Sequence, residues 1–129
     1  MIKDADTGAL KAFNFKKLIK GIPELKLLDC NIETVSFQKP IDSSNMQIKD
    51  WQKTATIIEE NYENFDGFVV LHGSDTMSYS ASALSFMFEN LEKPIVFTGS
   101  QLPIGDLRTD AKENLITAIQ IASLQDKGK

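Results

Sequence analysis

Apolar and polar positions follow two different periods along the chain. Between Gln47 and Tyr62 the apolar side chains recur at steps of three and four residues, which predicts a helix with one buried face. The residues of that face are Ile48, Trp51, Ala55, Ile58 and Tyr62. Two later runs, Phe68 to Gly73 and Pro94 to Phe97, are largely apolar, as in strands that are covered on both faces. Ile32 to Phe37 alternates apolar and polar residues, which predicts another strand.

Further helices are predicted between and beyond these strands. Ser78 to Leu91 and Thr109 to Leu124 each carry an apolar stripe, and Phe13 to Ile19 predicts a short helix that closes at Gly21 and Pro23. The stripe residues are Ala81, Leu84, Phe88 and Leu91 in the first helix, and Ala111, Leu115, Ala118, Ile119 and Ala122 in the second. Because strand, loop and helix repeat in this order, we expect an α/β fold, an open parallel sheet with helices on both faces in three flavodoxin-like layers.

Composition narrows the classes of function. A chain of 129 residues fits one domain, and 42% hydrophobic with 25% charged residues is typical of a globular protein. The net charge is -4 and there is no cluster of Lys and Arg, which argues against a nucleic-acid partner. No apolar run approaches the ~20 residues that cross a bilayer, so we expect no membrane partner. The single cysteine, Cys30, permits no internal disulfide, and a cytoplasmic location is expected.

Three polar loops are expected at one edge of the predicted sheet. They are Asp42 to Asn45, His72 to Thr76 and Thr98 to Gln101. In open parallel sheets, ligands bind outside the carboxyl ends of the strands, where such loops gather. The sequence therefore predicts that these loops form one site.

The loop HGSDT carries more hydroxyl and carboxylate groups than a strand-to-helix connection needs. Gly73 permits a tight turn, while Ser74 and Asp75 lie near a helix N-terminus, where free N–H groups favour an anion. A structural role is an equal alternative at this point, with Asp75 as the helix N-cap and Ser74 as a turn residue. For the loop DSSN, capping of the Gln47 helix by Ser44 or Asn45 is the favoured interpretation.

Several common kinds of catalytic site are absent from the sequence. His72 is the only histidine, and no G-x-S-x-G elbow holds a nucleophilic serine, so we interpret it as a strand-end histidine fixed by hydrogen bonds. One His, one Cys and dispersed carboxylates give no spacing typical of a metal site. The loop TGSQ lacks the Gly-Lys-Ser/Thr ending of a phosphate-binding loop.

Taken in order, these loops resemble a known family. "DGFVVLHGSDTMSYSASALSFMFENLEKPIVFTGSQLP" followed by "LRTDAKENLITAI" resembles the amino-terminal domain of the bacterial-type L-asparaginases, particularly their cytoplasmic type I branch. "PIDSSNM" resembles an earlier substrate loop of the same family. The resemblance runs from about Ile32 to Ala122 and is densest between Asp66 and Leu115.

The resemblance implies roles for five residues. Ser74 would supply a hydroxyl, and Asp75 would pair with a catalytic lysine and hold the substrate ammonium. Asp42 and Ser43, in the DSS loop, would bind substrate, with Ser43 meeting its α-carboxylate, and Ser100 would lie near the side-chain amide. The implied reaction is hydrolysis of asparagine to aspartate and ammonia through a hydroxyl nucleophile and an acyl-enzyme, without a cofactor or metal, in a homo-oligomer.

The sequence also departs from the family pattern. Ser74 replaces the usual threonine and keeps the hydroxyl, whereas the Thr-Gly-Gly-Thr-Ile motif with the primary nucleophile is missing and Ala9 stands near the place of a tyrosine. The partner lysine would lie beyond Lys129. We therefore expect residues 1–129 to be part of an amino-terminal domain, without its first strand and the carboxy-terminal domain, and to be inactive alone.

Two other functions stay open from the sequence. The first is the asparaginase-like subunit of a tRNA-dependent amidotransferase, which releases ammonia for a second active site. The second is a non-catalytic domain that binds an amino acid through Ser43 and Asp75. Turnover separates this second function from an asparaginase, because a binding domain retains the ligand without releasing ammonia.

Overall fold

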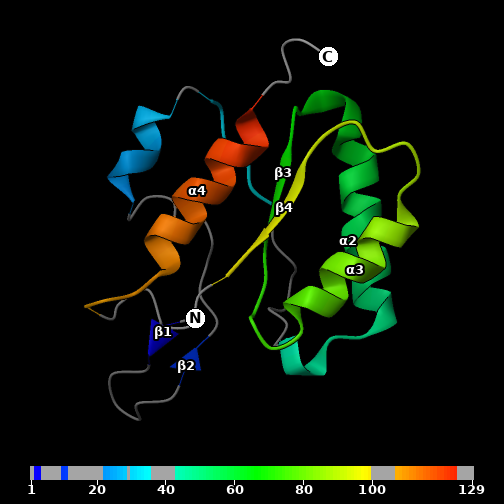
Figure 1. The fold of residues 1–129 in the computed structure, drawn as a ribbon, viewed down its shortest axis with the longest axis horizontal. Coiled ribbons are helices and arrows are strands. Elements are labelled where there is room, and N and C mark those ends of the chain that lie inside the picture. Colours follow the sequence, from blue (N-terminus) through cyan, green and yellow to red (C-terminus); the bar gives the residue numbers. More distant parts are fainter. Residues whose placement is uncertain are drawn as a thin grey trace.

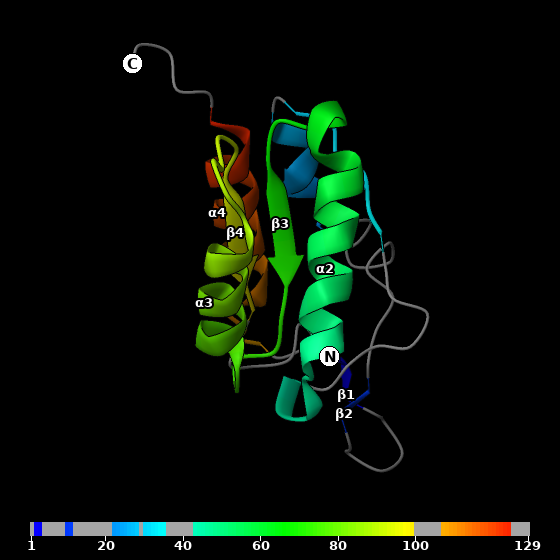
Figure 2. The same cartoon turned by 90° about the vertical axis from the view of Figure 1, so that its right-hand side faces the viewer.

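A parallel pair of strands lies between helices at the centre of the molecule (Figure 1). The computed structural model describes residues 2–3, 10–11, 22–28, 30–35, 43–99 and 107–124. Strand β3 (Phe68–Leu71) pairs in parallel with β4 (Ile95–Thr98), in the register Phe68 to Ile95 through Leu71 to Thr98. Figures 1 and 2 show α4 on one side of this sheet and α2 and α3 on the other. The predicted α/β fold with an open parallel sheet and helices on both faces is confirmed.

Helix α2 forms where the apolar period predicts it, but its start differs from the prediction. It spans Ile48–Asn61 and buries Ile58. Its N-cap is Gln47, whose backbone N–H donates to Oδ2 of Asp50 at 2.9 Å. The expectation that Ser44 or Asn45 caps this helix is wrong, because a 3-10 turn, η2 (Ser43–Asn45), precedes it and Asp50 supplies the acceptor in the first helical turn.

Helix α3 is shorter than its apolar pattern suggests. It spans Met77–Met87, four residues less than predicted at its end, and Leu91 is 44% exposed. The chain turns at Asn90, whose φ of 53° lies in the left-handed region that Asn tolerates better than most residues. Besides Leu84, the fully buried residue of this helix is a serine, Ser80.

Helix α4 carries most of the core. It spans Ala111–Ser123, and four of its five predicted inward residues are buried. They are Leu115, Ala118, Ile119 and Ala122. Two of them, Leu115 and Ile119, form a cluster with Ile22 and Leu25. Leu25 belongs to a 3-10 helix that the sequence did not predict, η1 (Pro23–Leu27).

An ion pair fastens η1 to α4 at the edge of this cluster. Nζ of Lys112 lies 2.6 Å from Oε1 of Glu24, and both side chains are about two-fifths exposed, at 42% and 43%. The Lys112 ammonium, as hydrogen-bond donor, lowers the pKa of Glu24 below its usual value, and a backbone hydrogen bond of Glu24 acts in the same direction.

The amino-terminal part differs most from expectation. A short antiparallel pair, β1 (Ile2–Lys3) with β2 (Leu10–Lys11), was not predicted. The predicted strand at Ile32 to Phe37 is wrong for residues 32–35, which form no strand in the part of the chain that the structure describes. Alternation there reflects one half-buried face, with Ile32 packed against the core, and an extended segment achieves this without strand pairing. The predicted helix at Phe13 to Ile19 lies outside the described residues.

Candidate functional site

The connection from β3 to α3 places Ser74 and Asp75 at the surface. The last sheet bond runs from the backbone N–H of His72 to the carbonyl of Thr98 at 2.9 Å. Helix α3 begins after Thr76, which is its N-cap. Ser74 and Asp75 occupy the turn between these two points, and both are exposed.

Helix capping does not account for Asp75. The N-cap position belongs to Thr76, one residue later, and Thr76 makes no side-chain capping bond. Among the residues that the structure describes, the Asp75 carboxylate and the Ser74 hydroxyl have no hydrogen-bond or ion-pair partner. Both groups at this turn are therefore available to a ligand.

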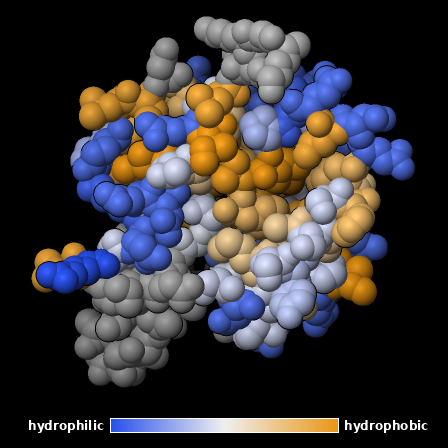
Figure 3. All heavy atoms as spheres, viewed as in Figure 1, coloured by the Kyte–Doolittle hydropathy of each residue, from blue (hydrophilic) through white to orange (hydrophobic). Residues whose placement is uncertain are grey.

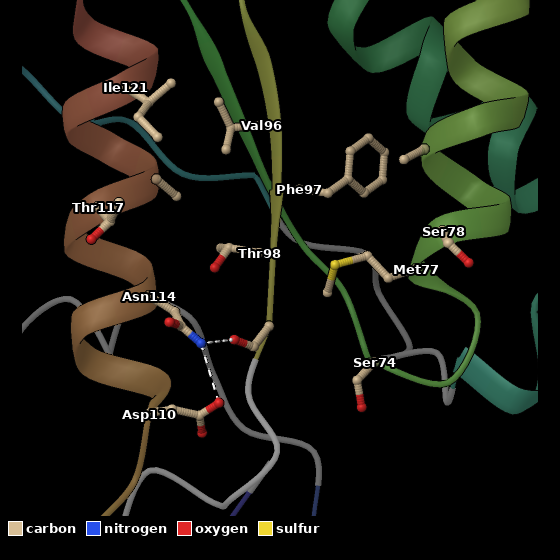
Figure 4. Close-up of a pocket in the computed structure, with 13 residues that line it drawn as sticks. Ser74, Met77, Ser78, Val96, Phe97, Thr98, Asp110, Asn114, Thr117 and Ile121 are labelled. Atoms are coloured by element: carbon tan, nitrogen blue, oxygen red, sulfur yellow. Dashed lines mark hydrogen bonds between the residues drawn. The ribbon is translucent and has the colours of Figure 1, made fainter.

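A groove of about 690 Å³ runs beside this turn, between α3 and α4 (Figure 4). Its floor is β4 and the residue after it, Val96 to Gly99. The walls are Ser74, Met77, Ser78 and Ala81 on one side, and Asp110, Asn114, Thr117, Ala118 and Ile121 on the other. Figure 3, in the view of Figure 1, shows apolar residues gathered in the middle of this face. Polar groups lie at the end where the strands finish, as Figure 4 shows for Ser74, Asp110 and Asn114.

Asn114 fixes the end of β4 to the start of α4. Its Nδ2 donates to the carbonyl of Gly99 at 2.8 Å and to Oδ2 of Asp110 at 3.2 Å (Figure 4). These bonds hold the backbone just before the loop that contains Ser100. Sequence reasoning did not identify Asn114, because a polar residue on an amphipathic helix is ordinarily solvent-facing.

The absence of a side chain at Gly99 brings two of the predicted loops together. A Cβ atom at Gly99 would lie 2.3 Å from the carbonyl oxygen of His72 and 2.8 Å from Cε of Met77. The backbone after β4 therefore runs directly beside the backbone that begins the 72–76 turn. This agrees with the expectation that these two loops share one edge of the sheet.

The other predicted site residues are only partly described. Ser43 begins η2 at the same end of the sheet as the 72–76 turn (Figures 1 and 2), and its side chain lies outside what the structure describes. Asp42 and Ser100 also lie outside the described residues. The roles of all five residues stay predictions, with Ser74 and Asp75 placed by the structure at the turn.

The single histidine is held as the sequence predicted, and by residues that it did not predict. Nδ1 of His72 lies 2.6 Å from the carbonyl oxygen of Gly73, and Nε2 lies 2.7 Å from Oγ of Ser80. The indole Nε1 of Trp51 donates to the same Oγ at 2.7 Å. The prediction that hydrogen bonds fix His72 is confirmed. A serine within an apolar helical stripe was the available sign of Ser80.

Two other kinds of site are not found within the described ranges. No group of three or more His, Cys, Asp or Glu there is arranged to hold a metal ion. No helix in the same ranges is long and apolar enough to cross a membrane.

Comparisons with known proteins place this geometry among amidohydrolases. The family model of the asparaginase N-terminal domain matches residues 1–129. The chain is 54% identical over 83 residues to L-asparaginase 1 of Escherichia coli (strain K12), a match covering 64% of this chain and 25% of that protein. It is 41% identical over 120 residues to a glutamyl-tRNA(Gln) amidotransferase subunit of Thermoplasma volcanium, covering 93% and 29%.

A solved structure shares the fold. The crystal structure of L-asparaginase I from Vibrio cholerae O1 biovar eltor superposes with a TM-score of 0.80 at 45% sequence identity. That match covers 94% of this chain and 37% of the other. The chain thus spans between 25% and 29% of the length of the two curated relatives.

Proposed function

Because the chain belongs to the family of the asparaginase N-terminal domain, we propose that the protein hydrolyses the side-chain amide of asparagine to aspartate and ammonia. Residues 1–129 would then be part of the amino-terminal domain of this enzyme. The reaction needs a hydroxyl nucleophile and N–H donors for the oxyanion, and it needs no cofactor. The nucleophile and a partner lysine would come from segments beyond those that resemble the family here.

The observation that carries this proposal is the position of Ser74 and Asp75. An exposed carboxylate and an exposed hydroxyl stand at the carboxyl end of β3, in a turn where helix capping uses neither. An amino acid carries an ammonium group, and a charge-assisted bond to a carboxylate suits it. We propose that Asp75 binds this ammonium and that Ser74 hydrogen-bonds near the reacting carbon.

The surrounding loops would complete the substrate site. Ser43 would accept the α-carboxylate, with Asp42 beside it, and the backbone near Ser100 would lie close to the amide. The close approach of Gly99 to the backbone of His72 supports this grouping, because it holds two of the three loops together at one edge. The groove along β4 would adjoin the substrate rather than contain it, since its lining is mainly apolar.

Turnover by a hybrid enzyme tests the proposal. In this hybrid, the present chain replaces the matching segment of the Vibrio cholerae L-asparaginase I, whose fold it shares. We expect the hybrid to release ammonia from L-asparagine and the isolated chain to release none. A folded hybrid that binds aspartate by calorimetry without releasing ammonia would contradict hydrolysis and favour a binding domain.

A second candidate is the ammonia-releasing subunit of a tRNA-dependent amidotransferase. The observation that favours it is the length of the Thermoplasma volcanium match, which takes in 93% of this chain. This function predicts that ammonia release rises when the partner subunit and charged tRNA are added to the protein. Release that is fast with asparagine alone and unaffected by these additions favours the asparaginase instead.

A further inference from the structure

Three elements of the fold meet at one buried hydroxyl group. Ser80 of α3 is 1% exposed, and its Oγ lies 2.7 Å from Nε1 of Trp51 on α2 and 2.7 Å from Nε2 of His72 at the end of β3. His72 also contacts the ring of Phe97 on β4, with ring centroids 6.0 Å apart. The imidazole is thus confined by groups from both strands and both neighbouring helices.

The donor and acceptor roles in this cluster have one self-consistent assignment. A carbonyl oxygen only accepts, so Nδ1 of His72, which lies 2.6 Å from the Gly73 oxygen, must carry a proton. An indole N–H only donates, so Ser80 Oγ accepts from Trp51. The Ser80 hydroxyl proton then points to Nε2 of His72, which accepts it in a neutral imidazole. Each polar hydrogen has one acceptor.

This directed chain ends on the peptide that opens the Ser74–Asp75 turn. The carbonyl of Gly73 and the N–H of Ser74 belong to one planar trans peptide and point in opposite directions. A bond from His72 Nδ1 to that carbonyl therefore also fixes the direction of the Ser74 N–H. Gly73, Ser74 and Asp75 are all exposed, so this bond is an anchor for a turn that lacks core packing of its own.

We propose that Ser80 and Trp51 are positioning residues: they hold His72 neutral with its proton on Nδ1, and His72 in turn orients the turn that carries Ser74 and Asp75. The effect on catalysis rests on the proposed function. The effect on the imidazole proton does not, because it follows from the hydrogen bonds alone.

The composition of the chain allows a direct test by NMR. His72 is the only histidine and Trp51 the only tryptophan, so the imidazole nitrogens and the indole N–H each give a single set of signals. We expect the full chain to show the proton on Nδ1 at neutral pH. A proton found on Nε2 would overturn the proposal.

Substitution of Ser80 and Trp51 provides the second arm. Ser80→Ala removes the donor to Nε2, and we expect a mixture of the two neutral tautomers together with faster solvent exchange of the Trp51 indole proton. The matched control is Ser85→Ala on the same helix, whose hydroxyl donates to the carbonyl of Ser82 away from this cluster; it should leave the tautomer unchanged. If Ser80→Ala does not fold, Trp51→Phe serves, because without the indole donor Ser80 Oγ can accept from Nε2. An unchanged tautomer in a folded variant would contradict the proposal.

Activity of the hybrid enzyme provides the third arm. We expect Ser80→Ala to lower kcat/KM for asparagine by about threefold to tenfold, the equivalent of one hydrogen bond, and Ser85→Ala to leave it unchanged. Activity that is insensitive to Ser80→Ala while the tautomer changes would overturn the positioning role. If no variant of the hybrid turns over asparagine but the tautomer responds, the proposed function fails while the hydrogen-bond assignment stands.

Discussion

At the scale of single residues, Gly99 decides how closely the ends of β3 and β4 approach. Its missing side chain leaves room for the carbonyl oxygen of His72, which would be 2.3 Å from a Cβ atom at this position. The oxygen belongs to the backbone and cannot rotate away as a flexible side chain can. The geometry of the 72–76 turn therefore depends on a residue in a different loop.

This contact predicts the effect of a small enlargement. Gly99→Ala is expected to destabilise the fold by about 1 to 3 kcal/mol, because the strand ends must move apart to admit the methyl group. Urea unfolding followed by the fluorescence of Trp51 measures the change. The exposed Ser82→Ala on α3 is the control and should change the stability by less than about 0.5 kcal/mol. Equal stability of Gly99→Ala and the wild type would show that the ends are loosely packed.

The sequence predicted some site residues because their chemistry is local. The crowding of Ser74 and Asp75 after an apolar run can be recognised without a structure. The roles of Ser80 and Asn114 could not be predicted, because each acts through a contact with a distant segment. Ser80 contacts Trp51, 29 residues away, and Asn114 contacts Gly99, 15 residues away.

At the scale of elements, α4 is the main support of the sheet. Leu115 is 1% exposed and lies in the core cluster with Ile22 and Leu25. Ile121 on the same helix is 45% exposed. Burial of one face and exposure of the other follow from the helical period. The stability of α4 should therefore depend on which face is changed.

This difference gives a matched pair of substitutions. Leu115→Ala is expected to cost about 2 to 5 kcal/mol, because it leaves a cavity in the core. Ile121→Ala, with half-exposed side-chain atoms, should cost about 1 kcal/mol or less. The free energies of unfolding in urea provide the comparison. Similar losses for both variants would contradict the assignment of the core.

The Glu24–Lys112 pair predicts a dependence of stability on pH. Since the ammonium of Lys112 lowers the pKa of Glu24 in the folded state, ionised Glu24 stabilises the fold above the usual glutamate pKa of about 4.3. That contribution is lost as pH falls through the lowered pKa.

The corresponding experiment compares unfolding midpoints in urea at neutral and acidic pH. Glu24→Gln should be less stable than the wild type at pH 7, and the difference should shrink toward zero near pH 3. Glu60→Gln, an exposed position on α2, controls for the loss of a charge and should show a smaller difference at neutral pH. A deficit of Glu24→Gln that is constant from pH 7 to pH 3 would contradict the ion pair as its source.

Elements with strong periodicity were predicted well, and elements that depend on partners were not. The helices α2 and α4 begin and end within two residues of their predicted bounds, because their apolar faces repeat over several turns. Ile32 to Phe37 reads as a strand, yet residues 32–35 form none, because strand formation requires a neighbouring strand that a local pattern does not supply.

At the scale of the whole molecule, the chain is one part of a larger family architecture. It covers 37% of the Vibrio cholerae L-asparaginase I chain, and the matching part is the α/β unit that carries the 72–76 turn. The apolar groove between α3 and α4 runs along the edge of β4. The site proposed here lies at the end of that groove, where the two strands finish.

The central claim is that Asp75 binds the ammonium group of asparagine. The most direct measurement is kcat/KM for ammonia release by the hybrid enzyme with Asp75→Asn, compared with Asp66→Asn, an exposed carboxylate at the opposite end of β3. Loss of a hydrogen-bonded charge predicts a fall of about 10- to 100-fold for Asp75→Asn. Asp66→Asn should remain within about twofold of the parent. Equal activity of the two variants would contradict the claim.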